Sequence, residues 1–502
     1  MNDIEIAQAV STILSKFTKA TPDEAPATSE AARVDGLDEI VAKALAQHSS
    51  VRDASAISQV AKVANASTGA FDTMDEAISA AVLAQVQYRH CSMQDRASFI
   101  NGIRDVFLQE DVLCALSRMA VEETGMGNYE DKLIKNRVAA LKTPGIEDLT
   151  TSAVSGDGGL TLIEYSAFGV IGSITPTTNP TETIINNSIG MLAAGNTVVF
   201  SPHPRSRKVS LYAVELINNK LAQLGAPANM VVTVTKPSID NTNVLINDPR
   251  INMLVATGGP AIVKTVMSSG KKAIGAGAGN PPAVVDETAD IEKAARDIIK
   301  GCSFDNNLPC VAEKEVIVVN QVADYLIHCM KKSGAYLLCD KKLSQQLQSL
   351  VLNEKGTGPN TAFVGKDARY ILQQLGIQVG DDIKVILIEA EKTHPFVVHE
   401  LMMPVVRVDN VDEAIELAVK VEHGNRHTAV MHSTNVEKLT KMARLIQTTI
   451  FVKNGPSYAG LGVGGEGHAT FTIAGPTGEG LTSARSFARR RRCVMVEALN
   501  IR

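Results

Sequence analysis

The sequence of 502 residues has no tryptophan, and aromatic residues make up only 4% of it. It also has no run of roughly twenty apolar residues, the length that a helix needs to cross a bilayer. Acidic residues occupy the N-terminus, MNDIEIAQAV, where a secretory signal would be basic. The formal net charge of −5 gives no general attraction to nucleic acid or to an anionic membrane. We therefore expect a cytoplasmic protein with neither nucleic acid nor membrane as a partner.

Cysteine is present, but in no pattern typical of disulfides or of zinc. The seven cysteines are odd in number and scattered, and no C-x-x-C or Cys/His cluster has metal-ligand spacing. Without a secretion signal, such thiols are expected to be reduced. The sequence therefore predicts no metal site, and its cysteines are Cys91, Cys114, Cys302, Cys310, Cys329, Cys339 and Cys493.

What remains is the composition of an ordinary globular protein, 45% hydrophobic and 21% charged. The length is sufficient for two or three domains with sizeable cores. From about residue 68, strand-like runs such as FGVIGSIT and GNTVVFSP alternate with amphipathic helical segments. A second series of this kind starts after about residue 283. Alternation of strands and helices predicts two α/β domains built on parallel sheets.

The first residues stand apart from the rest of the chain. In MNDIEIAQAVSTILSKF, apolar residues recur at helical spacing on one face. The segment that follows, TKATPDEAPATSEAARVDG, has the Ala, Thr, Pro and Glu content of a flexible linker. The pattern is equally consistent with a helix that docks in a groove of another protein and with one that folds back on its own chain. The apolar positions are Ile6, Val10, Ile13, Leu14 and Phe17.

Three polar turns follow predicted strands: TPTTNPTE (175–182), SPHPRSRK (201–208) and TGGPAIV (257–263). In a parallel α/β sheet, ligands bind at the carboxyl ends of the strands, and glycine-containing turns there suit a phosphate or a ribose. None of the three is a G-x-G-x-x-G motif, but together they favour a nucleotide site. The segment GAGAGNPP (275–282) presents backbone rather than side chains. This suits either close approach of a ligand or a tight crossing between domains.

Cys310 follows Pro309 at a turn between a helix that ends near SFDNN and a strand of the second series. This position is expected to face the seam between the two domains, where pockets favour binding. A thiolate there could attack a carbonyl carbon, and the position is also consistent with a buried structural cysteine. Cys302 falls within the helical pattern, and we expect it in the core.

A family resemblance is carried by longer motifs: SITPTTNPTETIINNSIGMLAAGNTVVFSPHP, ATGGPAIV, KKAIGAGAGNPPAVVDETAD, SFDNNLPCVAEKEV, HTAVMHS, FVKNGPSYAGLGVGGEG and PTGEGLTSARSFARRRRC. Over residues 68–502 the sequence resembles the aldehyde dehydrogenase superfamily. More closely, it resembles the CoA-acylating propionaldehyde dehydrogenases of bacterial microcompartments. The N-terminal helix and linker resemble the encapsulation peptides that load such enzymes into a protein shell, which favours docking for that helix.

The resemblance implies an aldehyde dehydrogenase fold in five segments. Residues 1–20 are expected to form the encapsulation helix, and 21–67 a flexible linker and lead-in. A Rossmann-like NAD domain is expected at 68–282, with an oligomerisation arm at about 151–166, and an α/β catalytic domain at 283–455. Residues 456–502 are expected to return to the cofactor domain and to the oligomer interface. The resemblance also implies a homotetramer inside a bacterial microcompartment, with a shell protein bound through the N-terminal helix.

The resemblance implies the chemistry as well. Cys310 matches the family's nucleophile, which carries the acyl group as a thioester, so that NAD is reduced first and CoA then takes the acyl group in a reversible, ping-pong reaction. The oxyanion donors are expected to be the Cys310 amide and a side chain, Asn179 or Thr178, of which we favour Asn179. Glu400 matches the glutamate that holds the nicotinamide ribose. The predicted cofactor-binding residues are Thr175, Pro176, Thr177, Thr178, Ser201, Pro202, His203, Thr257, Gly258, Gly259, Ile262, Gly277, Ala278, Gly279 and Glu400.

Two departures from the hydrolytic members of the superfamily bear on function. Those members have a glutamate that activates water, whereas this sequence has Ala276 at that position. Without this base the thioester is expected to survive until a thiol attacks it, which favours CoA over water as the acyl acceptor. Ser201 stands where they have a lysine beside the adenosine ribose, so the choice of NAD over NADP rests on the resemblance. A hydrolytic, NAD-dependent aldehyde dehydrogenase is the alternative.

Some polar groups are predicted to have no catalytic part. The run RRRR (489–492) is expected to pair across a subunit interface rather than to hold CoA phosphates. His423, His427 and His432 have no carboxylate or cysteine pattern around them and are interpreted as loop and strand histidines. Because no second nucleotide motif is found, one crevice is expected to serve NAD and CoA in turn. A purely structural role, nucleating microcompartment cargo, would need the N-terminal helix but not Cys310.

Overall fold

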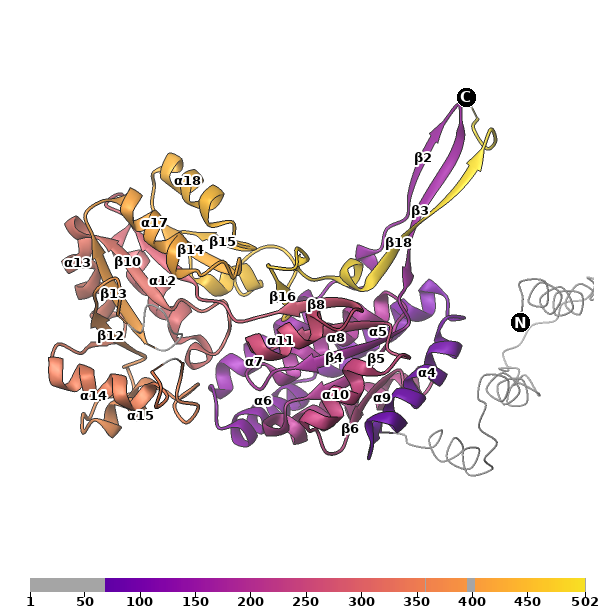
Figure 1. Ribbon diagram of the computed structural model, residues 1–502, viewed down its shortest axis with the longest axis horizontal. Coiled ribbons are helices and arrows are strands. Elements are labelled where there is room, and N and C mark those ends of the chain that lie inside the picture. Colours follow the sequence, from indigo (N-terminus) through magenta and orange to yellow (C-terminus); the bar gives the residue numbers. More distant parts are fainter. Residues whose placement is uncertain (1–67, 357, 395–401, 502) are drawn as a thin grey trace, which may run out of the picture. The chain divides into compact units, whose positions relative to one another are not determined.

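The computed structural model describes residues 68–356, 358–394 and 402–501, which lie within one compact unit, Ala61–Arg502 (Figure 1). The predicted N-terminal helix (1–20), the linker (21–67) and Glu400 lie outside the described residues. Two large parallel sheets and a smaller antiparallel one organise the described chain. This confirms the predicted α/β fold.

The first sheet has six parallel strands in the order β1-β6-β5-β4-β7-β8. Helices pack on both faces, and alternate residues of β5 enter different core clusters: Val198 packs with α8 and α9, and Val199 with α4 and α10. Burial on both faces explains why these strands are continuous apolar runs. The strands are β1 (Ala70–Phe71), β4 (Val170–Thr175), β5 (Thr197–Pro202), β6 (Val231–Val234), β7 (Met253–Thr257) and β8 (Lys272–Ala276).

Two helices of this part begin at reciprocal capping boxes. Ser92 and Asp95 form a reciprocal capping box at α5, as Thr73 and Glu76 do at α4. α8 starts with Pro180 in its first turn and is buried along its whole length. The helices are α4 (Met74–Tyr88), α5 (Met93–Phe107), α6 (Glu110–Thr124), α7 (Tyr129–Lys142), α8 (Pro180–Ala193), α9 (Arg207–Gln223), α10 (Ile239–Asn247) and α11 (Pro260–Met267).

The second sheet has seven parallel strands in the order β11-β12-β13-β10-β9-β14-β15. Its strands are β9 (Pro282–Val285), β10 (Glu315–Val319), β11 (Ala335–Leu337), β12 (Val385–Glu389), β13 (Met403–Val408), β14 (Thr428–His432) and β15 (Ile450–Lys453). Its helices are α12 (Ile291–Ser303), α13 (Asn320–Lys332), α14 (Lys341–Val351), α15 (Ala368–Gln374), α17 (Val411–Val421) and α18 (Val436–Ile446). The helix before Cys310 therefore ends at Ser303, as SFDNN predicted.

The third sheet joins segments that are far apart in sequence. β2 (Ser152–Gly156) and β3 (Gly159–Ala167) form a hairpin, and β18 (Ala488–Val496) pairs antiparallel with β3 from Ala488↔Ala167 to Val496↔Gly159 (Figure 1). The arginine run 489–492 lies within β18 and is exposed. Before β18, the short helix η5 (Ala484–Phe487) places Phe487 against Gly190 of α8.

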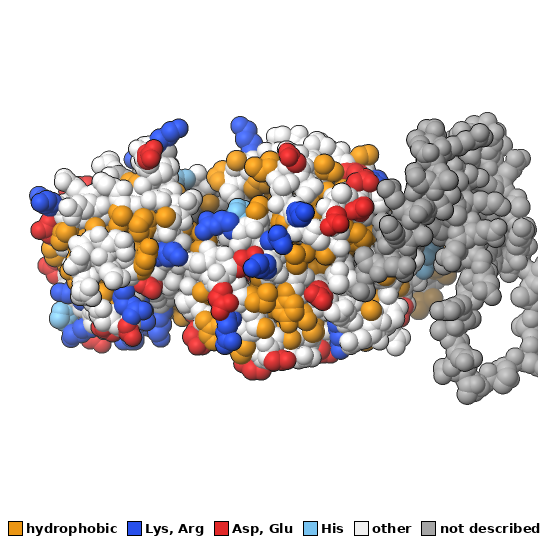
Figure 2. All heavy atoms as spheres, turned by 90° about the horizontal axis from the view of Figure 1, so that it is seen from below, with side chains coloured by type: hydrophobic (Ala, Val, Ile, Leu, Met, Phe, Trp, Pro, Cys, Tyr) orange, Lys and Arg blue, Asp and Glu red, His pale blue; other side chains and the backbone are white. Residues whose placement is uncertain are grey.

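Charges of both signs lie intermixed among apolar side chains on the face of the described residues that Figure 2 shows. In residues 68–356, 358–394 and 402–501, no helix is both long and apolar enough to cross a membrane. The same residues contain no group of three or more His, Cys, Asp and Glu side chains placed to hold a metal ion.

Candidate active site

A cavity of about 640 Å³ brings most of the predicted site residues together. Thr175, Ser201 and Thr257 come from the carboxyl ends of β4, β5 and β7, which meet at one edge of the first sheet. Cys310 enters the same cavity from the turn that precedes β10. The predicted residues in its lining are Thr175, Pro176, Thr177, Thr178, Asn179, Ser201, Pro202, His203, Thr257, Gly258, Gly259, Ile262, Gly277, Ala278 and Cys310.

Two predicted cofactor residues are not in this lining. Gly279 lies just behind it: a Cβ added there would be 2.5 Å from the carbonyl oxygen of Cys310 and 2.8 Å from Cγ of His427. Gly279 therefore separates the Cys310 main chain from the His427 ring, and only a residue without a side chain fits there. Glu400 falls outside the described residues, so its predicted contact with the ribose stays a prediction.

The glycines of the lining leave open space in front of the backbone. A Cβ added to Gly259 or to Gly277 would meet no atom within 4 Å, so the cavity extends up to the main chain at both places. Gly259 precedes α11, whose first turn has no side-chain cap, and the amide groups of that turn are available to an acceptor. An extended ligand with phosphate and ribose groups fits this lining.

The lining is poor in charge. Of the residues that line it in the described part of the chain, none is Asp or Glu, and Arg205 is the single Lys or Arg. Ala276 ends β8 directly before the lining residue Gly277 and is buried. Within the described lining there is consequently no carboxylate that could take a proton from water, which agrees with the interpretation of Ala276.

The turn that carries Cys310 is held by a network of hydrogen bonds. Asn307 donates from Nδ2 to the carbonyl oxygens of Cys302 and Glu313, each at 2.9 Å. Both carboxylate oxygens of Glu313 accept hydrogen bonds from Ser457, one from its amide at 2.8 Å and one from its hydroxyl at 2.6 Å. Burial raises the pKa of Glu313 to about 7. These bonds fix the loop on both sides of the half-buried Cys310.

Three consecutive residues of this turn adopt the left-handed backbone conformation. Asp305, Asn306 and Asn307 have φ values of 48°, 54° and 63°, a region that residues with a side chain seldom occupy. Such strain persists only where the surroundings hold it, and it concentrates at functional sites. The sequence indicated a helix end here, but the left-handed run was not foreseen.

Asn179 and Thr178 both line the cavity, and their side chains differ in what they offer. Oδ1 of Asn179 accepts a hydrogen bond of 2.5 Å from Nζ of Lys135. Its Nδ2 lies 3.3 Å from Oγ1 of Thr178. Asn179 precedes α8, but its side chain makes no capping bond with that helix. Its amide nitrogen is thus turned away from Lys135 and is not engaged in the helix cap.

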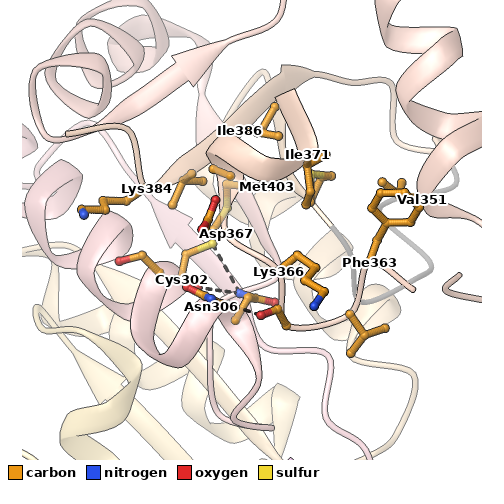
Figure 3. A pocket seen from close by; sticks show the side chains of 17 residues that line it. Cys302, Asn306, Val351, Phe363, Lys366, Asp367, Ile371, Lys384, Ile386 and Met403 are labelled. Atoms are coloured by element: carbon orange, nitrogen blue, oxygen red, sulfur yellow. Dashed lines mark hydrogen bonds between the residues drawn. The ribbon is translucent and has the colours of Figure 1, made fainter. Parts of the chain in front are cut away.

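Cys302, eight residues before Cys310, has a different environment. Cys302 is 6% exposed in α12, which confirms the expectation of a core position. It borders a separate small pocket of about 70 Å³, where Asn307 donates to its sulfur at 3.4 Å (Figure 3). Burial raises the pKa of Cys302 to about 12, so this thiol stays protonated and unreactive.

His427 is a residue that sequence reasoning interpreted as structural and that the structure places behind the site. It is 2% exposed, its Nδ1 lies 2.9 Å from Oγ1 of Thr428, and its Nε2 has no hydrogen-bond partner among the described residues. Burial, and secondarily the charge of Lys314, lowers the pKa of His427 to about 4. The ring is therefore neutral near pH 7, and its Nε2 is an acceptor in the tautomer whose Nδ1–H donates to Thr428.

Sequence reasoning also missed Arg205 and Lys135. Arg205 was visible within SPHPRSRK, at the end of a predicted strand, but arginines after strands are common on surfaces. Lys135 gave no local signal, because its partners Asn179 and Asp305 are 44 and 170 residues away in the sequence.

Two parallel α/β sheets, and a cysteine that faces a cavity at the strand ends of one of them, define a class of enzyme that couples a nucleotide to covalent catalysis. Residues 42–352 match the model of the aldehyde dehydrogenase family, and the chain belongs to that family. The propanal dehydrogenase (CoA-propanoylating) of Salmonella typhimurium is 52% identical over 440 residues, which are 86% of this chain and 93% of that protein. The predicted family resemblance is confirmed.

Solved structures agree with this result. A propionaldehyde dehydrogenase of Rhodopseudomonas palustris, with bound CoA and an acylated cysteine, is 72% identical with a TM-score of 0.86 over 87% of this chain and 100% of that one. An engineered glycolyl-CoA reductase with bound NADP+ is 70% identical, with a TM-score of 0.86 over 87% and 99% of the two chains. A propionaldehyde dehydrogenase from a fucose utilisation microcompartment of Clostridium phytofermentans is 52% identical, with a TM-score of 0.84 over 86% and 100%.

Proposed function

We propose that this enzyme oxidises a short aliphatic aldehyde, propionaldehyde in the first place, to its CoA thioester. The observation that carries the proposal is that Cys310 faces a cavity whose described lining contains no Asp or Glu. A cysteine supplies the nucleophile, and the missing carboxylate leaves water without a base. The relatives that are named for CoA-acylating activity and the structure with CoA and an acylated cysteine support the same conclusion.

Cys310 is the nucleophile of this proposal. Its thiol first loses its proton to solvent. The resulting thiolate sulfur adds to the carbonyl carbon of the aldehyde, the C=O π bond breaks, and the carbonyl oxygen becomes an oxyanion. Asn179 Nδ2 and the backbone amide of Cys310 donate to this oxygen. Asn179 is favoured over Thr178 because Lys135 holds its Oδ1, so that its nitrogen is left for the substrate. When bound, the nicotinamide cofactor accepts a hydride from the adduct, which leaves the acyl group on Cys310 as a thioester.

His427 is the proposed base for the second half of the reaction. A CoA thiol must lose its proton to attack the thioester, and Nε2 of His427 has no hydrogen-bond partner among the described residues. In the proposed tautomer, Nδ1–H donates to Oγ1 of Thr428, which leaves Nε2 to take the proton. The ring lies one glycine away from the Cys310 main chain. The thiolate then attacks the acyl carbon, acyl-CoA leaves, and the sulfur of Cys310 recovers a proton. This proposal adds a catalytic role to the loop or strand position predicted for His427.

One cavity is proposed to serve NAD and CoA in turn. The strand-end turns and the open glycines Gly259 and Gly277 suit the phosphates of either molecule, and Arg205 offers a cation to them. Successive occupation matches a ping-pong order, in which the reduced cofactor leaves before CoA enters. NAD is the proposed cofactor on the basis of the family resemblance, and Glu400 is its proposed ribose ligand.

Assembly is the last part of the proposal. The N-terminal segment 1–20 is proposed to bind a microcompartment shell protein, in line with the microcompartment origin of one related structure. The antiparallel sheet of β2, β3 and β18 is the proposed tetramer contact. It presents exposed apolar side chains, among them Val154, Val494 and Val496, that a neighbouring subunit would cover.

The test of the chemistry is NADH formation from propionaldehyde and NAD+, with and without CoA. We expect steady turnover only with CoA, and a burst of at most one NADH per active site without it. Cys310→Ala should abolish both signals.

Cys302→Ala is the matched control, since it removes a buried thiol from the same loop region and should keep the burst. Equal turnover without CoA would mean that water is the acceptor, and the hydrolytic assignment would replace this one. Parallel assays with NADP+ decide the cofactor.

A further inference from the structure

Four charged side chains are buried together between the two large sheets. Lys132 and Lys135 come from α7, Glu182 from α8, and Asp305 from the turn before Cys310, and each side chain is 0% exposed. Nζ of Lys135 lies 2.6 Å from Oδ2 of Asp305 and 2.9 Å from Oε1 of Glu182. Nζ of Lys132 lies 2.8 Å from the same Oδ2 of Asp305. Two positive and two negative groups thus balance within one buried cluster.

Lys135 and Asp305 stay ionised despite their burial, whereas burial and the charge of Lys135 lower the pKa of Lys132. Burial by itself would lower the pKa of Lys135, but the carboxylates of Asp305 and Glu182 outweigh it and raise that pKa. Likewise, burial would raise the pKa of Asp305, but Lys135 and Lys132 outweigh it and lower that pKa. Buried ion pairs of this kind are weak contributors to stability, because desolvation opposes their attraction. The cluster therefore needs an explanation other than stability.

The explanation begins with Asn179. An ammonium group can only donate hydrogen bonds, so the atom of Asn179 that faces Lys135 at 2.5 Å must be its oxygen. The nitrogen consequently points the other way, toward Oγ1 of Thr178 and the cavity that both residues line. Lys135 thus decides which end of the amide the substrate meets. Its charge also polarises the amide and makes the nitrogen a stronger donor.

The ammonium group of Lys135 also contacts the turn that precedes Cys310, through Asp305. Asp305 stands five residues before Cys310 and opens the run of left-handed residues. Its Oδ1 also accepts from the amide of Asn128 at 2.9 Å, and its own amide donates to Oδ2 of Asp131 at 2.7 Å. One lysine therefore connects the turn after β4, which carries Asn179, to the turn before β10, which carries Cys310.

We propose that Lys135 is a positioning residue that orients the Asn179 amide for oxyanion binding and fixes it relative to the Cys310 loop through Asp305. This inference rests on the proposed roles of Asn179 and Cys310. Because an oxyanion forms both when the aldehyde adds and when CoA attacks, loss of Lys135 slows both half-reactions. Loss of a base that takes the proton of the CoA thiol would slow only the second half-reaction.

The experiment measures the pre-steady-state NADH burst and the CoA-dependent step for Lys135→Met, Asn179→Ala and the double variant. Removal of one oxyanion donor costs about 10²–10³-fold in rate, and we expect this for Asn179→Ala. Misplacement of the donor costs about 10²-fold, which is the expected loss for Lys135→Met in both half-reactions. The double variant should be no slower than Asn179→Ala, since Lys135 then has no amide to orient.

Lys132→Met is the matched control. It removes the neighbouring lysine side chain from the same cluster and breaks a contact with the same Asp305 oxygen, but Lys132 bonds to the carbonyl oxygen of Thr178 and not to the Asn179 side chain. Its effect should be smaller and should add to that of Asn179→Ala. If Lys132→Met and Lys135→Met behave alike, or if the Lys135→Met loss persists in full without Asn179, the cluster is merely structural and the inference is overturned.

Folding is controlled separately. If Lys135→Met does not yield folded protein, Lys135→Arg and Asn179→Asp replace it in the test. Arginine keeps the charge and the donor function, and should retain the burst. Aspartate keeps an oxygen toward Lys135 but has no N–H for the oxyanion, and should lose the burst in a folded protein. Full activity in both Asn179 variants would instead refute the role of Asn179 and leave the CoA-acylating activity untouched.

Discussion

At the scale of single residues, burial separates the reactive groups from the inert ones. Cys302 and Cys310 are eight residues apart, but Cys302 is buried with its pKa raised to about 12, whereas Cys310 borders the cavity. His427 and His432 are equally buried, and the Nε2 of each has no hydrogen-bond partner among the described residues. They differ in position, because His427 packs behind the Cys310 loop and His432 lies at the end of β14. What decides function is the neighbourhood, since the residue types are the same.

His427 provides a prediction at this scale. His427→Gln should preserve the NADH burst, because the first half-reaction does not use the ring, and should slow CoA-dependent turnover by about 10²-fold or more, the usual contribution of a general base. Because the pKa of His427 is lowered to about 4, the ring is neutral above that pH and protonated below it. The CoA-dependent rate should therefore lose the contribution of this base only as the pH falls through about 4. Stopped-flow NADH absorbance with delayed addition of CoA measures both steps.

The control for this variant is His432→Gln. His432 is buried, and its pKa is also lowered to about 4, chiefly by burial, but it lies at the far end of β14 from His427. Its replacement should leave the ratio of burst to turnover as in the wild type. A His427→Gln enzyme that transfers its acyl group to CoA at the normal rate would show that another group takes the proton.

At the scale of elements, short turns between strands and helices place the binding residues and Cys310. The carboxyl ends of β4, β5 and β7 deliver three turns to one edge of the first sheet, and the segment from β8 to β9 runs beneath the Cys310 loop. That segment, GAGAGNPP, left two interpretations open. The structure supports both, at different residues: Gly277 opens to the cavity, and Gly279 is a tight crossing against the Cys310 main chain.

These two glycines give a paired prediction. In Gly279→Ala, the new Cβ would meet the carbonyl oxygen of Cys310 at 2.5 Å, so the nucleophile loop must shift. We expect kcat to fall by about 10²-fold, since a displacement of 1 Å has that effect on rate. In Gly277→Ala, the new Cβ meets no protein atom within 4 Å but enters the ligand space. We expect KM for NAD+ or CoA to rise, with a smaller change in kcat.

Steady-state kinetics for both substrates, with thermal unfolding of both variants as a check on folding, distinguishes the two effects. An unchanged kcat in Gly279→Ala would mean that the loop accommodates the methyl group and that the crossing does not set the position of Cys310.

At the scale of the whole molecule, function depends on segments that are distant in sequence. The cavity is lined by residues from Met126 to Phe471, and the buried charge cluster joins α7 to the turn before β10. The strand β18 pairs with β3 over nine residues, which connects the C-terminal part of the chain to a hairpin near residue 160. These long-range contacts assemble one site.

Deletion of residues 1–20 is the prediction at this scale. Because none of the described lining residues precedes Met126, the truncated enzyme should keep its CoA-dependent kcat and KM. It should lose entry into microcompartment shells, if the amphipathic helix is the docking element. Co-purification of full-length and truncated enzyme with shells measures packaging, and a full-length variant with Ile6 and Ile13 changed to Asp is the matched control. Truncated enzyme that still enters shells would assign docking to another surface.

The sequence by itself determined the fold class and the strand-end turns, and its family resemblance predicted Cys310 as the nucleophile and Ala276 in place of the water-activating glutamate. It could do so because strand and helix periodicities are local, and because Cys310, Asn179 and Ala276 lie in motifs long enough to be identified. The tertiary structure decided which cysteine faces the cavity, that the oxygen of the Asn179 amide faces Lys135, and that His427 packs behind the Cys310 loop. The physical reason is that burial and electrostatic pairing join residues across the fold: Lys135 meets Asp305 over 170 positions of sequence, and no local pattern records that contact.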